Sequence, residues 1–243
     1  MTCPRLTGQD RASCSLQSAA YFLILASFCL LVPSVRAQSY QTWPETSTYI
    51  KLNQDLRLYF IATKTKENRQ GTDAEIGPNL DFYLRPLVKW RAITVFDLDK
   101  SKSTPLLLRV GYRYLPSSAG PTEHRGVIEA TGRYALKSGF LFSDRNRADL
   151  RFIEWDFSWR YRNRITVERT VSILSYHFSP YVRAEAYFDS NNDKWSRTSE
   201  TAGLTYPIKK HMEVDVYFEH QNDTSKSPNR QINALGLALN FYF

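Results

Sequence analysis

Apolar and polar residues alternate with a period of two along most of the chain after its first 37 residues. Within 156–168, one parity holds Phe157, Trp159 and Ile165, whereas the other holds serine, arginine, threonine and glutamate. The stretch 105–115 shows the same alternation. A period of two with one apolar face is typical of a β-strand that has water on one side and an apolar medium on the other.

This pattern, followed along the chain, predicts about ten strands and allows any number from eight to twelve. Most of the runs reach the roughly 9–11 residues that a tilted strand needs to cross a bilayer. We therefore predict an all-β fold, an antiparallel transmembrane up-and-down β-barrel with an even number of strands. The predicted strands are 48–63, 76–90, 105–115, 122–134, 139–153, 156–168, 178–188, 195–206, 210–221 and 231–243.

The predicted connections differ between the two ends of the barrel. Short turns near 136–138 and 207–209 fall at one end, and a tight turn is expected at 154–156. The segment 91–104 is long enough to hold a further hairpin, and its role stays open. Polar loops at the other end are expected at 64–75, 116–121, 189–194 and 222–230.

A soluble β-sandwich is the alternative fold, because its strands alternate in the same way. A sandwich buries its apolar face and usually exposes a mixed polar surface. Here the polar face carries bulky charges of both signs on nearly every predicted strand. That density of charge favours a wet or salt-bridged lumen, with the apolar face turned to lipid.

The first 37 residues have the organisation of a secretory signal peptide. Arg5 and Arg11 precede a largely apolar run at 19–32, and Val35-Arg36-Ala37 provides a small-x-small cleavage site. The apolar run is shorter than the roughly 20 residues that a spanning helix needs. We therefore expect residues 1–37 to be a cleaved signal peptide and residues 38–243 to be the barrel domain.

Cysteine usage and charge exclude several other functions. All three cysteines, Cys3, Cys14 and Cys29, fall in the predicted leader, so the mature chain has no thiol for a disulfide, a metal or catalysis. We expect no cofactor and no metal site. The net charge of +8 is modest and the basic residues are spread over the chain, so nucleic acid is not an expected partner.

The last predicted strand ends on an aromatic residue. Leu239, Phe241 and Phe243 continue one apolar face to the end of the sequence. A terminal aromatic residue preceded by alternating apolar residues resembles the signal that the barrel assembly machinery of Gram-negative bacteria recognises. With the signal peptide, it predicts a location in the bacterial outer membrane, with outer-membrane lipid and the assembly machinery as partners.

Four short motifs resemble an outer-membrane β-barrel family, domain of unknown function 2490. The resemblance extends from about Trp43 to Phe243 and implies a fold and a compartment, but no activity. The first motif has Asp149 where the family usually has Glu. The motifs are Arg145-x-Arg147-x-Asp149-x-Arg151, Arg160-Tyr161-Arg162-x-Arg164, Tyr181-x-Arg183-x-Glu185-x-Tyr187 and Gly111-Tyr112-Arg113-Tyr114.

The charged residues on the inward parity are the candidates for function. Unpaired arginines would form a narrow pore or a binding barrel for small anionic solutes. Arginines paired with Asp149, Glu168 and Glu185 would instead make a closed structural barrel. The candidate lumen residues are Arg109, Arg113, Arg145, Arg147, Asp149, Arg151, Arg160, Arg162, Arg164, Arg183 and Glu185.

Catalysis is a third hypothesis, because some small outer-membrane barrels deacylate lipid. His177-Phe178-Ser179 has the His-x-Ser spacing of lipid A deacylases, which places both side chains on one face of a strand. The match is only three residues long, lies near a predicted turn and lacks that family's neighbouring residues. The other histidines show no metal-ligand spacing. We therefore do not expect an enzyme.

Overall fold

A computed structural model describes residues 39–67, 72–85, 92–93, 97–98, 101–118, 120–173, 176–225 and 229–243. The chain divides into two units, Met1–Arg36 and Ala37–Phe243. All described residues belong to the second unit. The predicted signal peptide and its cleavage site lie outside the described residues, so the expected cleavage stays a prediction.

The described residues form twelve strands and two short 3₁₀ turns. No helix within the described ranges is long and apolar enough to cross a membrane. The strands are β1 (Ser39–Lys51), β2 (Leu56–Glu67), β3 (Thr72–Leu84), β4 (Leu106–Leu115), β5 (Glu123–Ala135), β6 (Phe140–Ile153), β7 (Asp156–Arg169), β8 (Val171–Ile173), β9 (Tyr176–Asp189), β10 (Lys194–Lys209), β11 (Met212–Asp223) and β12 (Arg230–Tyr242). The 3₁₀ turns are η1 (Ser101–Ser103) and η2 (Lys137–Gly139).

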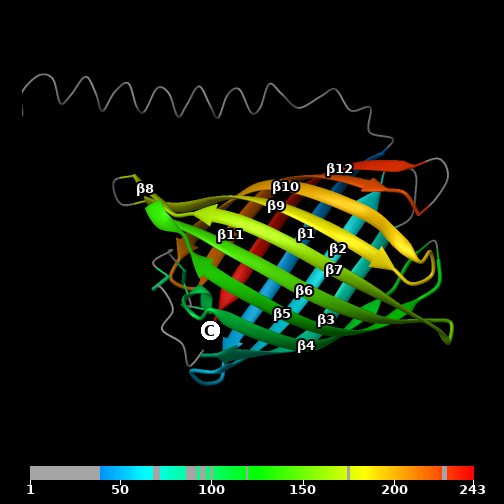
Figure 1. The fold of residues 1–243 in the computed structure, drawn as a ribbon, viewed down its shortest axis with the longest axis horizontal. Helices are drawn as coiled ribbons and strands as arrows, with labels where there is room; N and C mark the ends of the chain where they lie inside the picture. The colour runs from blue at the N-terminus through cyan, green and yellow to red at the C-terminus, as the bar shows by residue number, and fades with distance from the viewer. Residues whose placement is uncertain are drawn as a thin grey trace, which may run out of the picture. The chain divides into compact units, whose positions relative to one another are not determined.

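Eleven of the described strands close into a barrel (Figure 1). Neighbours from β1 to β7 pair in antiparallel fashion, β7 pairs with β9, and β9 to β12 continue the sheet. β12 then pairs with β1 in parallel, with Ser39 opposite Ile232 and Tyr49 opposite Tyr242. The short β8 extends the sheet only by pairing with β9. The predicted all-β barrel of about ten strands is confirmed.

The expectation of an even number of strands is wrong. The predicted strand 48–63 is in fact a hairpin, in which β1 and β2 are joined by the turn 52–55. In that turn, Asn53 Oδ1 accepts a hydrogen bond of 2.8 Å from the backbone N–H of Asp55. The polar run Asn53-Gln54-Asp55 therefore interrupts the alternation and ends a strand. In the segment 91–104, the described residues contain η1 and no strand.

The connections fall at the two ends of the barrel as the sequence predicts. The C-terminal end holds Phe243 and the turns 52–55, 136–139 and 210–211, and there β3 and β7 end and β4 and β9 begin. The N-terminal end is where β1 begins, β2 and β11 end, and β3 and β12 begin, and it holds the described residues 116–118, 120–122, 154–155 and 190–193. Because β1 and β12 are parallel, the first strand starts at the end opposite to the one at which the last strand finishes.

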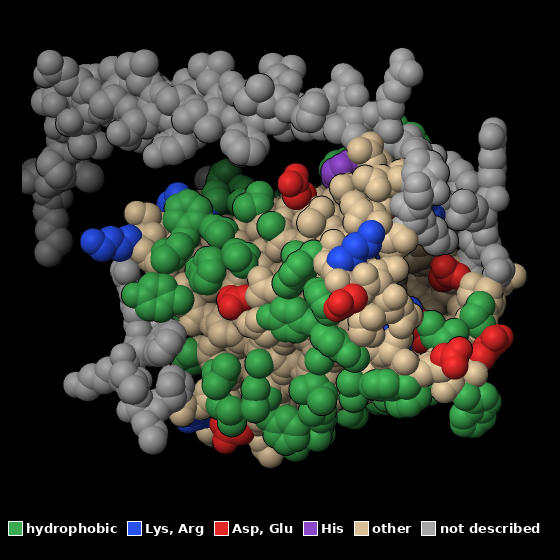
Figure 2. Space-filling model, turned by 45° about the vertical axis from the view of Figure 1, so that its right-hand side comes forward, with side chains coloured by type: hydrophobic (Ala, Val, Ile, Leu, Met, Phe, Trp, Pro, Cys, Tyr) green, Lys and Arg blue, Asp and Glu red, His purple; other side chains and the backbone are tan. Residues whose placement is uncertain are grey.

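The outer face of the barrel is apolar. Figure 2 shows hydrophobic side chains spread over the visible surface, with few charged groups among them. Aromatic side chains are exposed toward both ends, including Phe152, Trp155 and Phe157 at the N-terminal end and Tyr134 and Phe140 at the C-terminal end. Exposed aliphatic side chains occupy the middle of their strands, among them Val110, Ile128, Val182, Val216 and Leu237.

The inner face is polar. Among the described residues, buried polar and charged side chains outnumber buried apolar ones, and Arg113, Asp81 and Asp149 are 1% exposed or less. This reverses the usual arrangement of a soluble domain, in which charged side chains are almost never fully buried unless paired. The alternation in the sequence therefore separates an apolar exterior from a charged lumen.

Two glycines let tyrosines of neighbouring strands lie flat against the barrel wall. A Cβ atom at Gly203 would clash with the Tyr181 ring, and one at Gly236 would clash with the Tyr217 ring. The two tyrosines lie opposite these glycines in the register of β9–β12. Aromatic side chains that cover glycines on neighbouring strands pin the register of a curved sheet.

Candidate solute-binding lumen

The inward-facing positions of β6 and β7 carry arginines that lie opposite one another. In the register of these strands, Arg145 lies across from Arg164, and Arg147 lies across from Arg162. Like charges at directly opposed positions of an antiparallel pair repel each other. The two strands therefore need a carboxylate from elsewhere, and the neighbouring strand β9 supplies Glu185.

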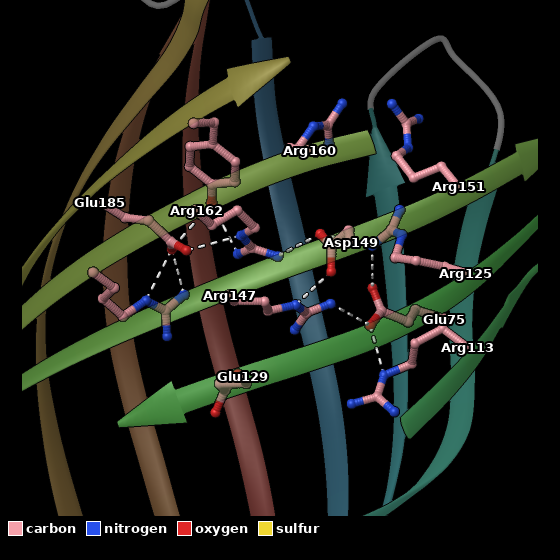
Figure 3. Close-up of polar contacts among 12 residues, drawn as sticks. Glu75, Arg113, Arg125, Glu129, Arg147, Asp149, Arg151, Arg160, Arg162 and Glu185 are labelled. Atoms are coloured by element: carbon pink, nitrogen blue, oxygen red, sulfur yellow. Dashed lines mark hydrogen bonds and ion pairs between the residues drawn. The ribbon is translucent and has the colours of Figure 1, made fainter. Parts of the chain in front are cut away.

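Glu185 is the carboxylate at the centre of this arginine cluster (Figure 3). Its Oε1 accepts hydrogen bonds from Arg145 Nη2 at 2.7 Å and from Arg162 Nε at 2.8 Å. Its Oε2 accepts hydrogen bonds from Arg164, from Nη2 at 2.6 Å and from Nε at 2.8 Å. The side chain of Glu185 is only 2% exposed. Three guanidinium groups thus share one buried carboxylate, which leaves the cluster positively charged.

Asp149 of β6 has a similar place among three arginines. Its Oδ1 accepts a hydrogen bond of 2.6 Å from Arg147 Nε. Its Oδ2 lies 3.8 Å from Arg162 Nη1 and 4.0 Å from Arg125 Nη1. The carboxylate is fully buried. Asp149 therefore neutralises only part of the charge around it.

A third group of charges follows β2 to β5. Asp81 lies between Arg57, at 2.7 Å, and Arg109, at 2.6 Å. Arg109 also lies 3.4 Å from Glu129, and Glu129 lies 3.8 Å from Arg145. This chain of contacts connects the group at Asp81 to the cluster around Glu185.

A fourth group lies toward the N-terminal end. Glu123 binds Arg125 and Arg151, each at 2.8 Å. Asp189 binds Arg160 at 2.7 Å and lies 3.4 Å from Arg151. With Glu75, which contacts Arg113, Arg125 and Arg147, these ion pairs join into one network across β2–β7 and β9. Its arginines are Arg57, Arg109, Arg113, Arg125, Arg145, Arg147, Arg151, Arg160, Arg162 and Arg164, and its carboxylates are Glu75, Asp81, Glu123, Glu129, Asp149, Glu185 and Asp189.

A cavity of about 850 Å³ occupies the lumen. All of the network's arginines except Arg151 line it, whereas only Glu75 and Glu129 do so among the network's carboxylates. The guanidinium groups therefore face the cavity, and most of the carboxylates lie behind them. We call this surface, on β2–β7 and β9, the arginine wall.

The remaining part of the lumen carries carboxyl groups, and we call it the acidic wall. Glu45 of β1 and Glu213, Asp215 and Glu219 of β11 line the cavity there. Asp215 lies 3.7 Å from Arg183 Nη2. Within the described residues, the other three form no ion pair. They accept hydrogen bonds from neutral donors: Glu45 from Ser47 and Thr63, Glu213 from Asn240 and Tyr242, and Glu219 from Thr201.

The 3₁₀ turn η1 contributes to the lumen at the C-terminal end. Lys102 Nζ lies 3.0 Å from Glu168 of β7, and Arg133 Nη1 donates hydrogen bonds to the backbone oxygens of Ser101 and Thr104. Burial alone would lower the pKa of Lys102, but the carboxylates of Glu168 and a neighbouring aspartate outweigh it and raise that pKa above its ordinary value. Ser101 and Lys102 line the cavity, so the turn forms part of the lumen wall at this end.

The structure brings together the residues that the sequence singled out. Every predicted lumen residue forms one of the ion pairs above, and all except Asp149, Arg151 and Glu185 line the cavity. Glu168 pairs with a lysine of η1 rather than with an arginine. The prediction that these residues bind a solute stays a prediction. Leu239, Phe241 and Phe243 lie on the outward parity of β12, and their role in assembly also stays a prediction.

Sequence reasoning missed several charged residues of the lumen, among them Glu45, Arg57, Glu75, Asp81 and Asp189. Arg57 fell within the predicted strand 48–63, whose true division into a hairpin was not recognised. Glu45 lies in β1, before that predicted strand, and Glu75 and Asp81 belong to β3. The alternation of Arg57 and Tyr59 with Leu58 and Phe60 is the signal that could have placed β2 in the barrel.

The histidine and serine of the predicted His-x-Ser pair hydrogen-bond to other groups. His177 Nδ1 is 2.8 Å from Ser172 Oγ on β8, and Ser179 Oγ is 3.3 Å from Thr170 Oγ1. Ser179 is buried, whereas the contact between His177 and Ser172 is exposed. Among the described residues, no group of three or more His, Cys, Asp or Glu side chains is placed to hold a metal ion.

Fold and lumen together define a class of protein, a closed β-barrel with an apolar exterior and a salt-bridged, charged interior. The chain belongs to the family described as protein of unknown function (DUF2490), whose model matches residues 40–232. The family resemblance of the arginine motifs is thereby confirmed. A search of curated proteins found no match to the chain.

Proposed function

We propose that this protein is an outer-membrane β-barrel that passes small anionic solutes through its lumen. The observation that carries the proposal is the arrangement of the arginine wall. Nine arginines line the cavity there, while five of the seven network carboxylates lie behind them. Fixed positive charge in a narrow, weakly screened passage concentrates anions.

The exterior supports a membrane location. A band of exposed aliphatic side chains lies between aromatic side chains near both ends, as expected for a barrel in a bilayer. The partners of this proposal are outer-membrane lipid, the assembly machinery and the anionic solute. It includes no catalytic step.

The cavity is suited to small solutes. Its lining includes Ser117 and Arg230 near the N-terminal end and Lys102 and Tyr242 near the C-terminal end. Spread over the roughly 30 Å of a hydrocarbon core, about 850 Å³ gives a mean cross-section of roughly 30 Å². A lumen of that mean cross-section suits ions and small molecules.

A closed structural barrel is the competing function. The observation that favours it is that every arginine of the network has a carboxylate within 4 Å. In that case the charges would only hold the strands together. Conductance separates the two functions, because a closed barrel carries no current.

The test is the current through purified protein in a planar bilayer under a KCl gradient. We expect a conducting barrel whose reversal potential shows anion selectivity. Arg164→Gln should weaken the selectivity without unfolding the barrel, because Glu185 keeps its bonds to Arg145 and Arg162. Arg169→Gln is the matched control, since Arg169 lies on the same strand and is exposed outside the lumen. A correctly folded barrel without current would refute the proposal and favour the closed barrel.

A further inference from the structure

The two walls of the lumen have opposite charge. The arginine wall faces the cavity with guanidinium groups, and the acidic wall faces it with Glu45, Glu213, Asp215 and Glu219. A solute inside the cavity is therefore exposed to cations on one side and to carboxyl groups on the other. An anion would be attracted to the first wall and repelled by the second.

Three carboxyl groups of the acidic wall, those of Glu45, Glu213 and Glu219, form no ion pair within the described residues, whereas Asp215 on the same wall lies 3.7 Å from Arg183. Glu213 and Glu219 are more than nine-tenths buried and line the cavity, yet their hydrogen bonds come from neutral groups. Glu45 interacts electrostatically with Arg183 and Arg164, Glu219 with Arg164, and Glu213 with Lys102. Arg183 contacts Asp215 at 3.7 Å instead, and Lys102 pairs with Glu168 at 3.0 Å. The guanidinium of Arg164 is bonded to Glu185 at 2.6 Å, so it is not free to pair with Glu45 or Glu219. A carboxylate buried in a narrow lumen is costly without a cation.

We infer that the preferred solute of this lumen is a small zwitterion, with an anionic group at one end and an ammonium group at the other. The anionic group would bind the arginine wall, and the ammonium group would supply the cation that Glu45, Glu213 and Glu219 lack. The inference rests on the proposed function, because it names the class of solute that passes through the same cavity.

Three solutes of nearly the same size test the inference. Glycine is the zwitterion, glycolate is the anion and ethanolammonium is the cation. Each is loaded into liposomes that contain the protein, and its release is followed at pH 7 with the membrane potential held at zero. The stabilisation from one solvent-exposed ion pair corresponds to a factor of about five in an equilibrium constant. We therefore expect glycine to be released about fivefold faster than glycolate. Ethanolammonium should be the slowest.

Two variants assign the preference to the acidic wall. Glu219→Gln keeps a hydrogen-bond acceptor for Thr201 but removes the charge. It should bring the ratio of the release rates of glycine and glycolate close to one. It should also increase the anion selectivity of the current in the planar bilayer, because a negative charge has been removed from the lumen. Glu154→Gln is the control, since Glu154 lies in the exposed turn 154–155 and should leave the ratio unchanged.

The outcomes separate this inference from the proposed function. A barrel that carries an anion-selective current but releases glycolate at least as fast as glycine overturns the inference and leaves the proposed function standing. The same conclusion follows if Glu219→Gln and Glu45→Gln both keep the full preference for glycine. A barrel that carries no current and releases none of the three solutes overturns both.

Discussion

Removing the carboxylate of Glu185 should destabilise the barrel far more than removing any one of its arginine partners. Glu185 is 2% exposed and is the shared acceptor for Arg145, Arg162 and Arg164. In Glu185→Gln the three guanidinium groups stay together without the charge that compensates them. In Arg164→Gln, by contrast, the carboxylate keeps two cations.

The magnitude follows from this geometry. Two guanidinium groups about 5 Å apart repel by roughly 3 kcal/mol at an effective dielectric constant of 20. Arg162 and Arg145 retain weaker contacts, with Asp149 and Glu129 at 3.8 Å each, which offset part of that repulsion. We therefore expect Glu185→Gln to lower the free energy of unfolding by about 4 kcal/mol, within the range for a broken buried pair. Arg164→Gln should lower it by about 1 kcal/mol.

The assay is reversible unfolding by guanidinium chloride in lipid vesicles, followed by tryptophan fluorescence. A double-mutant cycle gives the sharpest result. Adding Arg164→Gln to Glu185→Gln removes one of the repelling cations, so the double variant should be more stable than Glu185→Gln alone. The reasoning is wrong if Glu185→Gln costs no more than Arg164→Gln, or if the second substitution makes the first one worse.

Two further predictions concern the membrane. Val216→Arg places a charge on the exposed middle of β11 and should lower the free energy of unfolding in vesicles by about 2–4 kcal/mol. The inward-facing Asp215→Asn should be better tolerated. Equal losses of stability in the two variants would argue against a lipid-facing exterior. If the C-terminal end lies in the periplasm, a cysteine in the turn 154–155 should react with a membrane-impermeant thiol reagent on intact cells, whereas one in the turn 210–211 should not. Labelling of both turns, or of 210–211 alone, would contradict this orientation.

The inward and outward faces of most strands could be predicted from the sequence because they depend on a local property. Successive side chains of a strand point to opposite faces, so a correct parity at Arg160 also fixes Arg162 and Arg164. The same rule places Val216 and Leu108 on the outside, and both are exposed. The fold class and most of the lumen residues follow from that alternation alone.

The number of strands and the partners of each charge could not be predicted in the same way. A turn such as 52–55 is only a few residues long, and missing it changed the strand count from even to odd. The contact between Glu185 and Arg145 joins strands β9 and β6, which are not neighbours in the sheet. The pairing of Glu168 with Lys102 depends on a connection that carries no alternation. Such contacts follow from the closure of the barrel, and local periodicity contains no information about them.

The polarity of the lumen arises from the different lengths of its side chains. An arginine has a long stem that carries its charge well away from the backbone, whereas the carboxylate of an aspartate stays close to it. On a wall with both, such as β6 with Arg147 and Asp149, the carboxylate is fully buried while the guanidinium lines the cavity. Such a wall presents positive charge to a solute even where its numbers of positive and negative side chains are nearly equal. On β11, Glu213 and Glu219 form no ion pair within the described residues, so their carboxyl groups line the cavity with only neutral hydrogen-bond donors bound to them. The opposition of the two walls therefore follows from which strands carry arginine, and it persists although most of the arginines are paired.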